Sequence, residues 1–214
     1  MEPLEKISKT SPEIWDRESF IDTIKCLNLL DSSELHDSTT VNWDEKASMI
    51  IPEITKPLYQ IKQWESCEFG VKVPNEGLKG IYFWIGDRDF LNSFQGSLYF
   101  NEDDWAANAH FSPGECETYY VFESVADSLD YLDISEDKIE EIMVSFSVYT
   151  ILRALNKCLK IPEILNAAMV IGYSSGDELV LGEFIEGRFF QNLTLIDGGY
   201  YDNNKYQRLA RPVT

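Results

Sequence analysis

The run of apolar residues that follows Ser135 constrains the fold more than any other part of the chain. Large apolar side chains recur in it at three- and four-residue spacing, which is the period of one helix face. They are Ile139, Ile142, Met143, Phe146, Tyr149, Leu152, Leu155 and Leu159. Glu136 and Asp137 fall in the first turn, where carboxylates favour a helix, and Pro162 would end it. The sequence therefore predicts a long helix over about 135–160 whose apolar face packs in the core.

The N-terminal part of the chain predicts a second helix, from Ser11 to about Leu30. Ser11 can cap this helix, and Pro12 suits its first position. Its buried stripe would consist of Trp15, Phe20, Ile21, Ile24, Leu27 and Leu30. The polar residues 31–40 that follow predict a loop.

The middle of the chain changes from an ambiguous pattern to a β-rich one. Residues 50–70 are ambiguous. Pro52 and Pro57 interrupt the pattern, and the apolar residues there fit either a helical or a strand period. Beyond them, apolar and aromatic residues form short runs with turn residues between them. The predicted strands are 69–73, 80–85, 97–100 and 117–122.

The last third of the chain predicts a β-hairpin followed by a third strand. Residues 167–172 and 178–184 would form the hairpin around a turn at 174–177, and 188–196 the third strand. The expected fold class is α+β: one domain over 1–214, with a twisted antiparallel sheet on which the N-terminal helix and the long helix pack. The polar tail 198–214 is expected either to be loose or to lie against an acidic surface.

Negative charge is concentrated in one part of the chain. Residues 89–152 contain fourteen Asp and Glu but a single basic residue, Lys138, so they carry −13 of the total net charge of −19. Apolar residues are interleaved with these acids, and 44% of the whole chain is hydrophobic, so the stretch is expected to fold. A folded surface this acidic would attract a basic protein partner, whereas the simpler alternative is that the charge only keeps the protein in solution.

The candidate partner-binding residues are the carboxylates in the densest parts of this stretch and two aromatic anchors among them. They are Glu102, Asp103, Asp104, Trp105, Asp127, Asp130, Tyr131, Asp133, Glu136, Asp137, Glu140 and Glu141. Direct nucleic-acid binding is disfavoured, because the chain has eighteen Lys and Arg against thirty-seven Asp and Glu. Membrane binding is disfavoured by the same charge, and no apolar run approaches the ~20 residues of a membrane span.

The start of the chain has neither the basic nor the apolar region of a signal peptide, so a cytoplasmic location is expected. The cysteines agree with that expectation. Cys26, Cys67, Cys116 and Cys158 form no C-x-x-C pair and have no histidine at ligand spacing, so they are expected to be reduced thiols.

Residues Gly172 to Gly176 match the G-x-S-x-G pattern of a hydrolase nucleophile elbow, with Ser174 as the nucleophile. That elbow requires a helix directly after it, but the following residues alternate as in a strand. In hydrolases of this type the catalytic histidine follows the serine, yet His36 and His110 both precede it. The match is therefore interpreted as a hairpin turn, and no catalytic residue is predicted.

Metal and cofactor sites are not predicted either. The acidic segments 87–89 and 101–104 lack the ligand spacing and the central glycine of a calcium loop. No glycine-rich phosphate loop is present. His110 has apolar neighbours and is expected to be structural, and His36 lies in a polar segment and is expected to be solvated.

These patterns favour a non-catalytic binding protein that neutralises a basic protein. Strongly acidic bacterial proteins of this kind are commonly immunity proteins that cover the active site of a cognate toxin, often a nuclease with a basic cleft, and this analogy rests on charge alone. One alternative is a DNA mimic that inhibits a nucleic-acid-binding enzyme. An alternative of another class is a hydrolase that uses Ser174 or a carboxylate-bound metal, which a fluorophosphonate label on Ser174 would favour.

Overall fold

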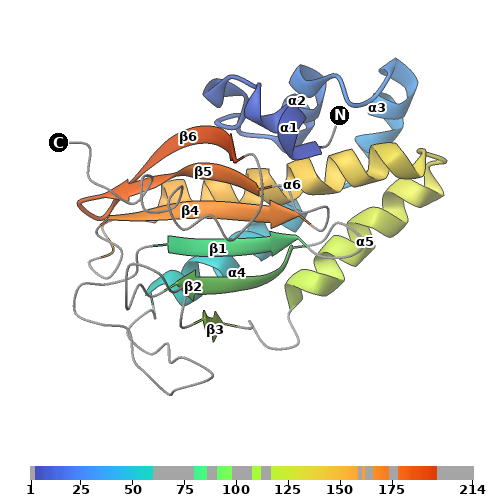
Figure 1. The fold of residues 1–214 in the computed structure, drawn as a ribbon. Coiled ribbons are helices and arrows are strands. Elements are labelled where there is room, and N and C mark those ends of the chain that lie inside the picture. Colours follow the sequence, from blue (N-terminus) through green and yellow to red (C-terminus); the bar gives the residue numbers. More distant parts are fainter. Residues whose placement is uncertain are drawn as a thin grey trace.

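The computed structural model describes residues 3–59, 80–85, 91–97, 108–111, 117–158, 161, 166–173 and 178–196. These residues form a mixed β-sheet with helices packed against it, as Figure 1 shows. The α+β class predicted from the sequence is therefore confirmed. The helices are α1 (Pro3–Ser8), the 3₁₀ helix η1 (Pro12–Ile14), α2 (Phe20–Leu27), α3 (Ser32–Ser38), α4 (Trp43–Tyr59), α5 (Glu117–Tyr131) and α6 (Glu136–Lys157). The strands are β1 (Gly80–Ile85), β2 (Leu91–Ser97), β3 (Asn108–Phe111), β4 (Asn166–Tyr173), β5 (Glu178–Ile185) and β6 (Arg188–Ile196).

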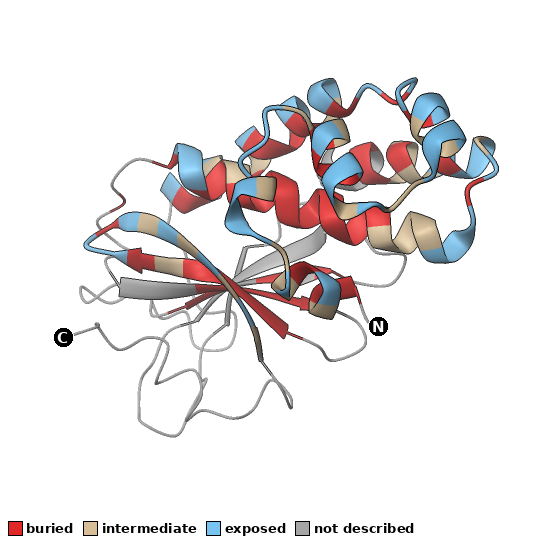
Figure 2. Ribbon diagram, turned by 90° about the horizontal axis from the view of Figure 1, so that it is seen from above, coloured by how far each residue is buried: buried red, intermediate tan, exposed pale blue. Residues whose placement is uncertain are grey.

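The strands lie in the order β3-β2-β1-β4-β5-β6. Strands β1 and β4 run parallel, with Ile81 opposite Met169, and the other neighbouring pairs among the described strands are antiparallel. A parallel pair needs a crossover connection, and helices α5 and α6 lie between β1 and β4 in the chain. The strands fan out with the twist expected of an open sheet, as the view from above in Figure 2 shows. The sequence predicted an antiparallel sheet. The observed sheet is mostly antiparallel but includes the parallel pair of β1 and β4.

The predicted hairpin at the end of the sheet is confirmed. Strands β4 and β5 pair antiparallel with Gly172 opposite Glu178, and β5 pairs in turn with β6. Residues 174–177, which connect β4 to β5, lie outside the described residues. Because the element after them is a strand, the strand–turn–helix geometry of a nucleophile elbow is absent from this part of the described chain.

Helix α6 is the centre of the fold. The prediction of a long helix is confirmed, but the prediction that it has a single buried face is wrong, because the residues from Ile142 to Leu152 are all buried. The sheet, α4, α5 and the N-terminal helices enclose this part of α6, which Figure 2 shows as a continuous buried stretch. Polar side chains inside such a buried helix need hydrogen-bond partners, and the helix backbone can supply them. Ser147 and Thr150 are satisfied in this way, since their hydroxyls donate to the carbonyls of Met143 and Ser147.

An aromatic cluster joins α6 to three other helices. The ring centroid of Phe146 lies 4.9 Å from that of Phe20 in α2, 5.2 Å from Trp43 at the start of α4 and 5.7 Å from Phe122 in α5. All four side chains are buried, and the ring pairs are tilted or edge-to-face, the arrangements that aromatic quadrupoles favour. The cluster therefore fixes how the helices meet.

The single N-terminal helix predicted from Ser11 to Leu30 is wrong. The structure has η1 and α2 with an interruption between them, in which Ser19 is extended (φ −112°, ψ 138°) and precedes the first residue of α2. Tertiary hydrogen bonds explain the break. The hydroxyl of Tyr149 donates to the carbonyl of Glu18 at 2.9 Å, and Arg153 donates to the carbonyl of Arg17 at 2.8 Å. The carbonyls of Arg17 and Glu18 therefore accept hydrogen bonds from side chains of α6. In a continuous helix they would instead accept from N–H groups later in their own segment.

The predicted loop at 31–40 is also wrong, because α3 lies there. Asp31 accepts hydrogen bonds from the backbone N–H groups of Ser33 and Glu34, while the Glu34 carboxylate accepts from the N–H of Asp31. This reciprocal capping box makes even a short polar helix favourable. The segment left open from residue 50 onward is helical as far as Tyr59, as part of α4.

The strand predicted at 117–122 is a helix, the first part of α5. Aromatic and β-branched residues favour a strand locally, but tertiary packing decides the outcome here. Val121, Phe122, Val125 and Leu129 are buried at helical spacing. The predicted strand at 80–85 is confirmed as β1, whereas residues 69–73, 98–100 and the tail 198–214 lie outside the described residues.

Among the helices that the structure describes, none combines the length and the apolar character needed to cross a bilayer.

The aromatic cluster should dominate stability. Replacing Phe146 by Ala leaves a cavity where α2, α4 and α5 meet α6, so the free energy of unfolding is expected to fall by about 3–5 kcal/mol. Phe190 is the matched control, because its side chain is 52% exposed on β6. Phe190→Ala should change the stability by no more than about 0.5 kcal/mol. Urea unfolding followed by circular dichroism measures both values, and similar losses for the two variants would contradict this description of the core.

Candidate protein-binding surface

The surface begins on α5, whose buried positions fix which residues point outward. Val125 and Leu129 face the core with relative exposures of 0%. Residues on the other side of the helix must then face solvent, because side chains three and four apart share a face. Asp127, Asp130 and Tyr131 are exposed for this reason, and Tyr131 is 90% exposed.

The turn from α5 into α6 is held by backbone hydrogen bonds. Asp133 adopts a left-handed conformation (φ 58°), which Asp tolerates better than most residues. The next N–H, that of Ile134, donates to the carbonyl of Leu129, and the Ile134 side chain is buried. Together with the bond from the N–H of Asp133 to the carbonyl of Asp130, this is the Schellman arrangement of a helix end. Asp133 therefore projects into solvent from an ordered corner.

The start of α6 continues the same surface. Ser135 is extended (ψ 147°) and its carbonyl accepts from the N–H groups of Lys138 and Ile139. Glu136 and Asp137 occupy the first helical turn, near the positive end of the helix dipole, and both are exposed. Their charges stabilise the helix start and face solvent at the same time.

We call the exposed residues of this region the acidic corner. They are Asp127, Asp130, Tyr131, Asp133, Glu136 and Asp137. Residues 123–141 as a whole hold eight carboxylates and one lysine, a net charge of −7. A ring that is almost fully exposed thus lies among several carboxylates, at the end of the molecule where α5 meets α6 (Figure 1).

Helix α3 adds charge that the sequence interpretation missed. The Lys138 ammonium lies 2.6 and 2.7 Å from the two carboxylate oxygens of Glu34, which holds α3 beside the start of α6. Asp37 of this short helix and Asp31, its N-cap residue, are exposed. Hydrogen bonds from the N–H of Glu34 and from Ser33 lower the pKa of Asp31 and favour its charged form. The spacing Asp31-x-x-Glu34 is the sequence signal that could have revealed α3.

Glu140 and Glu141 differ from the rest of the predicted set, since both are half-buried one turn further along α6. Glu141 forms an ion pair with Lys6 of α1. It therefore joins α1 to α6 and does not face open solvent as the acidic corner does. Glu102, Asp103, Asp104 and Trp105 lie outside the described residues.

Of the residues considered for catalysis, Ser174 lies outside the described residues. His36 is exposed in α3, and His110 lies in β3 opposite Gln95 of β2. These parts also contain no group of three or more His, Cys, Asp or Glu side chains placed to hold a metal ion.

Comparison with protein-family models, with curated proteins and with solved structures finds no match for this chain. A fold by itself does not specify a function. Function must therefore be inferred from the charge, exposure and geometry of the surface itself.

The described cysteines are both free, one at the surface and one inside. Cys26 is exposed at the end of α2, and Cys158 is buried directly after α6. Burial raises the pKa of the Cys158 thiol to about 11, because the apolar surroundings disfavour the thiolate. Cys67 and Cys116 lie outside the described residues.

Thiolate chemistry should separate these two cysteines. Iodoacetamide at pH 8 is expected to modify Cys26 in the folded protein and to modify Cys158 only after unfolding, as read from peptide masses. The raised folded pKa also predicts a pH dependence. Stability is unaffected below the ordinary thiol pKa of 9.0, and falls as the pH rises from there toward 11, because only the unfolded state loses the proton. Cys158→Ala should reduce that fall, and an unchanged pH profile would contradict the burial of this thiol.

Proposed function

We propose that this protein is a non-catalytic binding protein whose acidic corner neutralises a basic protein partner. The observation that carries the proposal is the exposure of Tyr131 among carboxylates on an ordered helix–turn–helix corner. Exposed acids are common on protein surfaces, but a 90% exposed aromatic ring among them is not needed for solubility.

The corner combines the two contributions that protein association uses. Its carboxylates attract a positively charged surface over a distance comparable with the Debye length, about 10 Å at 0.1 M salt, and so raise the association rate. Tyr131 offers a large rigid ring that can be buried on contact, and its face can receive an arginine or lysine side chain. Because the ring can be buried against another protein, we expect the partner to be a protein rich in basic side chains and not a free cation.

The partner class that fits best is a toxin with a basic active-site cleft, such as a nuclease, and the protein would then act as its immunity protein. A cleft that binds phosphate must be positive, so an acidic corner is complementary to it. We place this activity in the cytoplasm, where the free thiols of Cys26 and Cys158 would remain reduced. Affinity capture from the native cell, followed by mass spectrometry, should identify a basic partner or one with a basic cleft.

Charge reversal tests the role of the acidic corner. Changing Asp130, Asp133 and Asp137 together to Lys should slow association with the captured partner at low salt by at least about tenfold, and weaken its dependence on ionic strength. The reason is that these exposed carboxylates carry the steering field. Stopped-flow mixing over a range of salt concentrations measures both quantities.

The control is a second triple variant with the same change in net charge. Glu13, Asp16 and Glu18 are exposed carboxylates of the N-terminal region around η1, so their reversal to Lys alters the total charge equally but leaves the corner intact. This control should retain most of the association rate. Equal effects of the two variants, or an acidic partner, would contradict the proposal and leave solubility as the reason for the charge.

The absence of catalysis has its own test. Ser174→Ala and His110→Ala should each leave neutralisation of the partner intact, because the proposed mechanism needs neither a nucleophile nor a base. The assay is the partner's own activity, titrated with each variant. If either variant lost neutralisation while its fold and partner affinity survived, a catalytic mechanism would replace the binding mechanism.

A further inference from the structure

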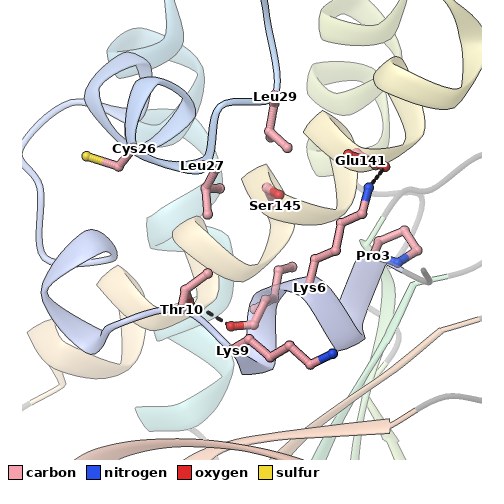
Figure 3. A pocket seen from close by; sticks show the side chains of 10 residues that line it. Pro3, Lys6, Lys9, Thr10, Cys26, Leu27, Leu29, Glu141 and Ser145 are labelled. Atoms are coloured by element: carbon pink, nitrogen blue, oxygen red, sulfur yellow. Dashed lines mark hydrogen bonds and ion pairs between the residues drawn. The ribbon is translucent and has the colours of Figure 1, made fainter.

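A cavity of about 300 Å³ lies between α1, the end of α2 and the middle of α6. Ile7, Leu27 and Leu29 contribute apolar walls, and Ser145 of α6 lines it from the core side. Figure 3 shows the side chains of Leu27 and Leu29 directed toward the part of α6 that carries Ser145. The volume is at the lower end of the range of about 300–1,000 Å³ that small-molecule sites occupy.

Ser145 is the unusual member of this lining. Ser145 is only 3% exposed, yet its hydroxyl makes no hydrogen bond to any described residue. The other buried serines and threonines of the described chain all donate to backbone carbonyls: Thr23, Ser38, Ser147 and Thr150. A buried hydroxyl is normally bonded, because an unpaired one loses the hydrogen bonds it had in water. Ser145 thus offers an unused hydrogen-bonding group to the cavity.

The charged groups at the rim, Lys6, Lys9 and Glu141, all take part in ion pairs. Lys6 forms an ion pair with Glu141, and the Lys9 ammonium lies 2.7 Å from a carboxylate oxygen of Glu5. Each ammonium group at the rim therefore has a carboxylate partner, and a charged ligand would have to compete with one of these ion pairs. Thr10 is also engaged, since its hydroxyl donates to the carbonyl of Ile7 and accepts from the indole N–H of Trp15.

We propose that this cavity binds an uncharged, largely apolar small molecule that carries a hydrogen-bond acceptor such as a carbonyl oxygen. The apolar part would lie against Ile7, Leu27 and Leu29, and the acceptor would take the proton of the Ser145 hydroxyl. The site is separate from the acidic corner and does not depend on the proposed partner-binding function.

The neutral fluorophore Prodan, a naphthalene with a ketone acceptor, is a suitable probe. Fluorescence titration of the full chain should show saturable binding to one site with a blue-shifted emission. Ser145→Ala removes only the donor, and should weaken binding by about three- to tenfold, the loss expected for one neutral hydrogen bond. Leu29→Trp fills the cavity and should abolish binding.

Ser147→Ala is the matched control, because this buried serine of the same helix bonds to Met143 and does not line the cavity. It should keep the wild-type affinity for Prodan but lower the thermal unfolding midpoint. Ser145→Ala should leave that midpoint unchanged or raise it, since no protein hydrogen bond is lost. This comparison keeps the test valid even if Leu29→Trp fails to fold.

Competition by simple naphthalenes tests the charge of the ligand. The neutral 2-acetylnaphthalene should displace Prodan, whereas 2-naphthoate and 2-naphthylmethylammonium should displace it much less, because each would have to break a rim ion pair. The proposal is overturned by the absence of saturable Prodan binding, by wild-type affinity in Ser145→Ala, or by equal displacement with the charged competitors.

Discussion

The contacts of Phe146 join the parts of this protein that are far apart in the sequence. Phe20, Trp43 and Phe122 come from three separate helices, and each packs against this one ring of α6. With the sheet on another side, α6 is buried all round from Ile142 to Leu152, and its first turns extend beyond the core. Because these turns continue a helix that is buried in the core, the core anchors the backbone that carries their carboxylates. The acidic corner thus depends on the same packing that stabilises the fold.

The positions of two lysines show how a strongly acidic chain can still pack its helices together. Lys138 is the single basic residue between positions 89 and 152, and it forms an ion pair with Glu34 of α3. Lys6 forms an ion pair with Glu141, which joins α1 to α6. These lysines attach peripheral helices to the central one, while Asp130, Asp133 and Asp137 remain exposed. Repulsion among these carboxylates lowers the stability of the compact state, and the proposed partner of opposite charge would relieve it.

Long periodic patterns could be predicted from the sequence, and features fixed by tertiary contacts could not. The helix after Ser135 and the β4–β5–β6 meander were predictable, since each has many residues of one period and clear turns. The break before Ser19 depends on hydrogen bonds from Tyr149 and Arg153, which lie more than a hundred residues away in the chain. In α5, burial of Phe122 against Phe146 overrides the strand preference of its aromatic residues. For the candidate surface, charge density alone indicated the segment, but the exposure of Tyr131 and the contribution of α3 required the structure.

Hydrogen–deuterium exchange of the protein alone and bound to its captured partner tests the central claim most directly. If the acidic corner is the interface, amide protection should increase from Glu123 to Glu141 and in α3, because binding excludes water and suppresses local opening there. The amides of the β6 edge and of η1, which lie elsewhere on the molecule, should exchange at the same rate in both states. Protection confined to β6 or η1, with residues 123–141 unchanged, would show that the partner binds another surface and would contradict the account.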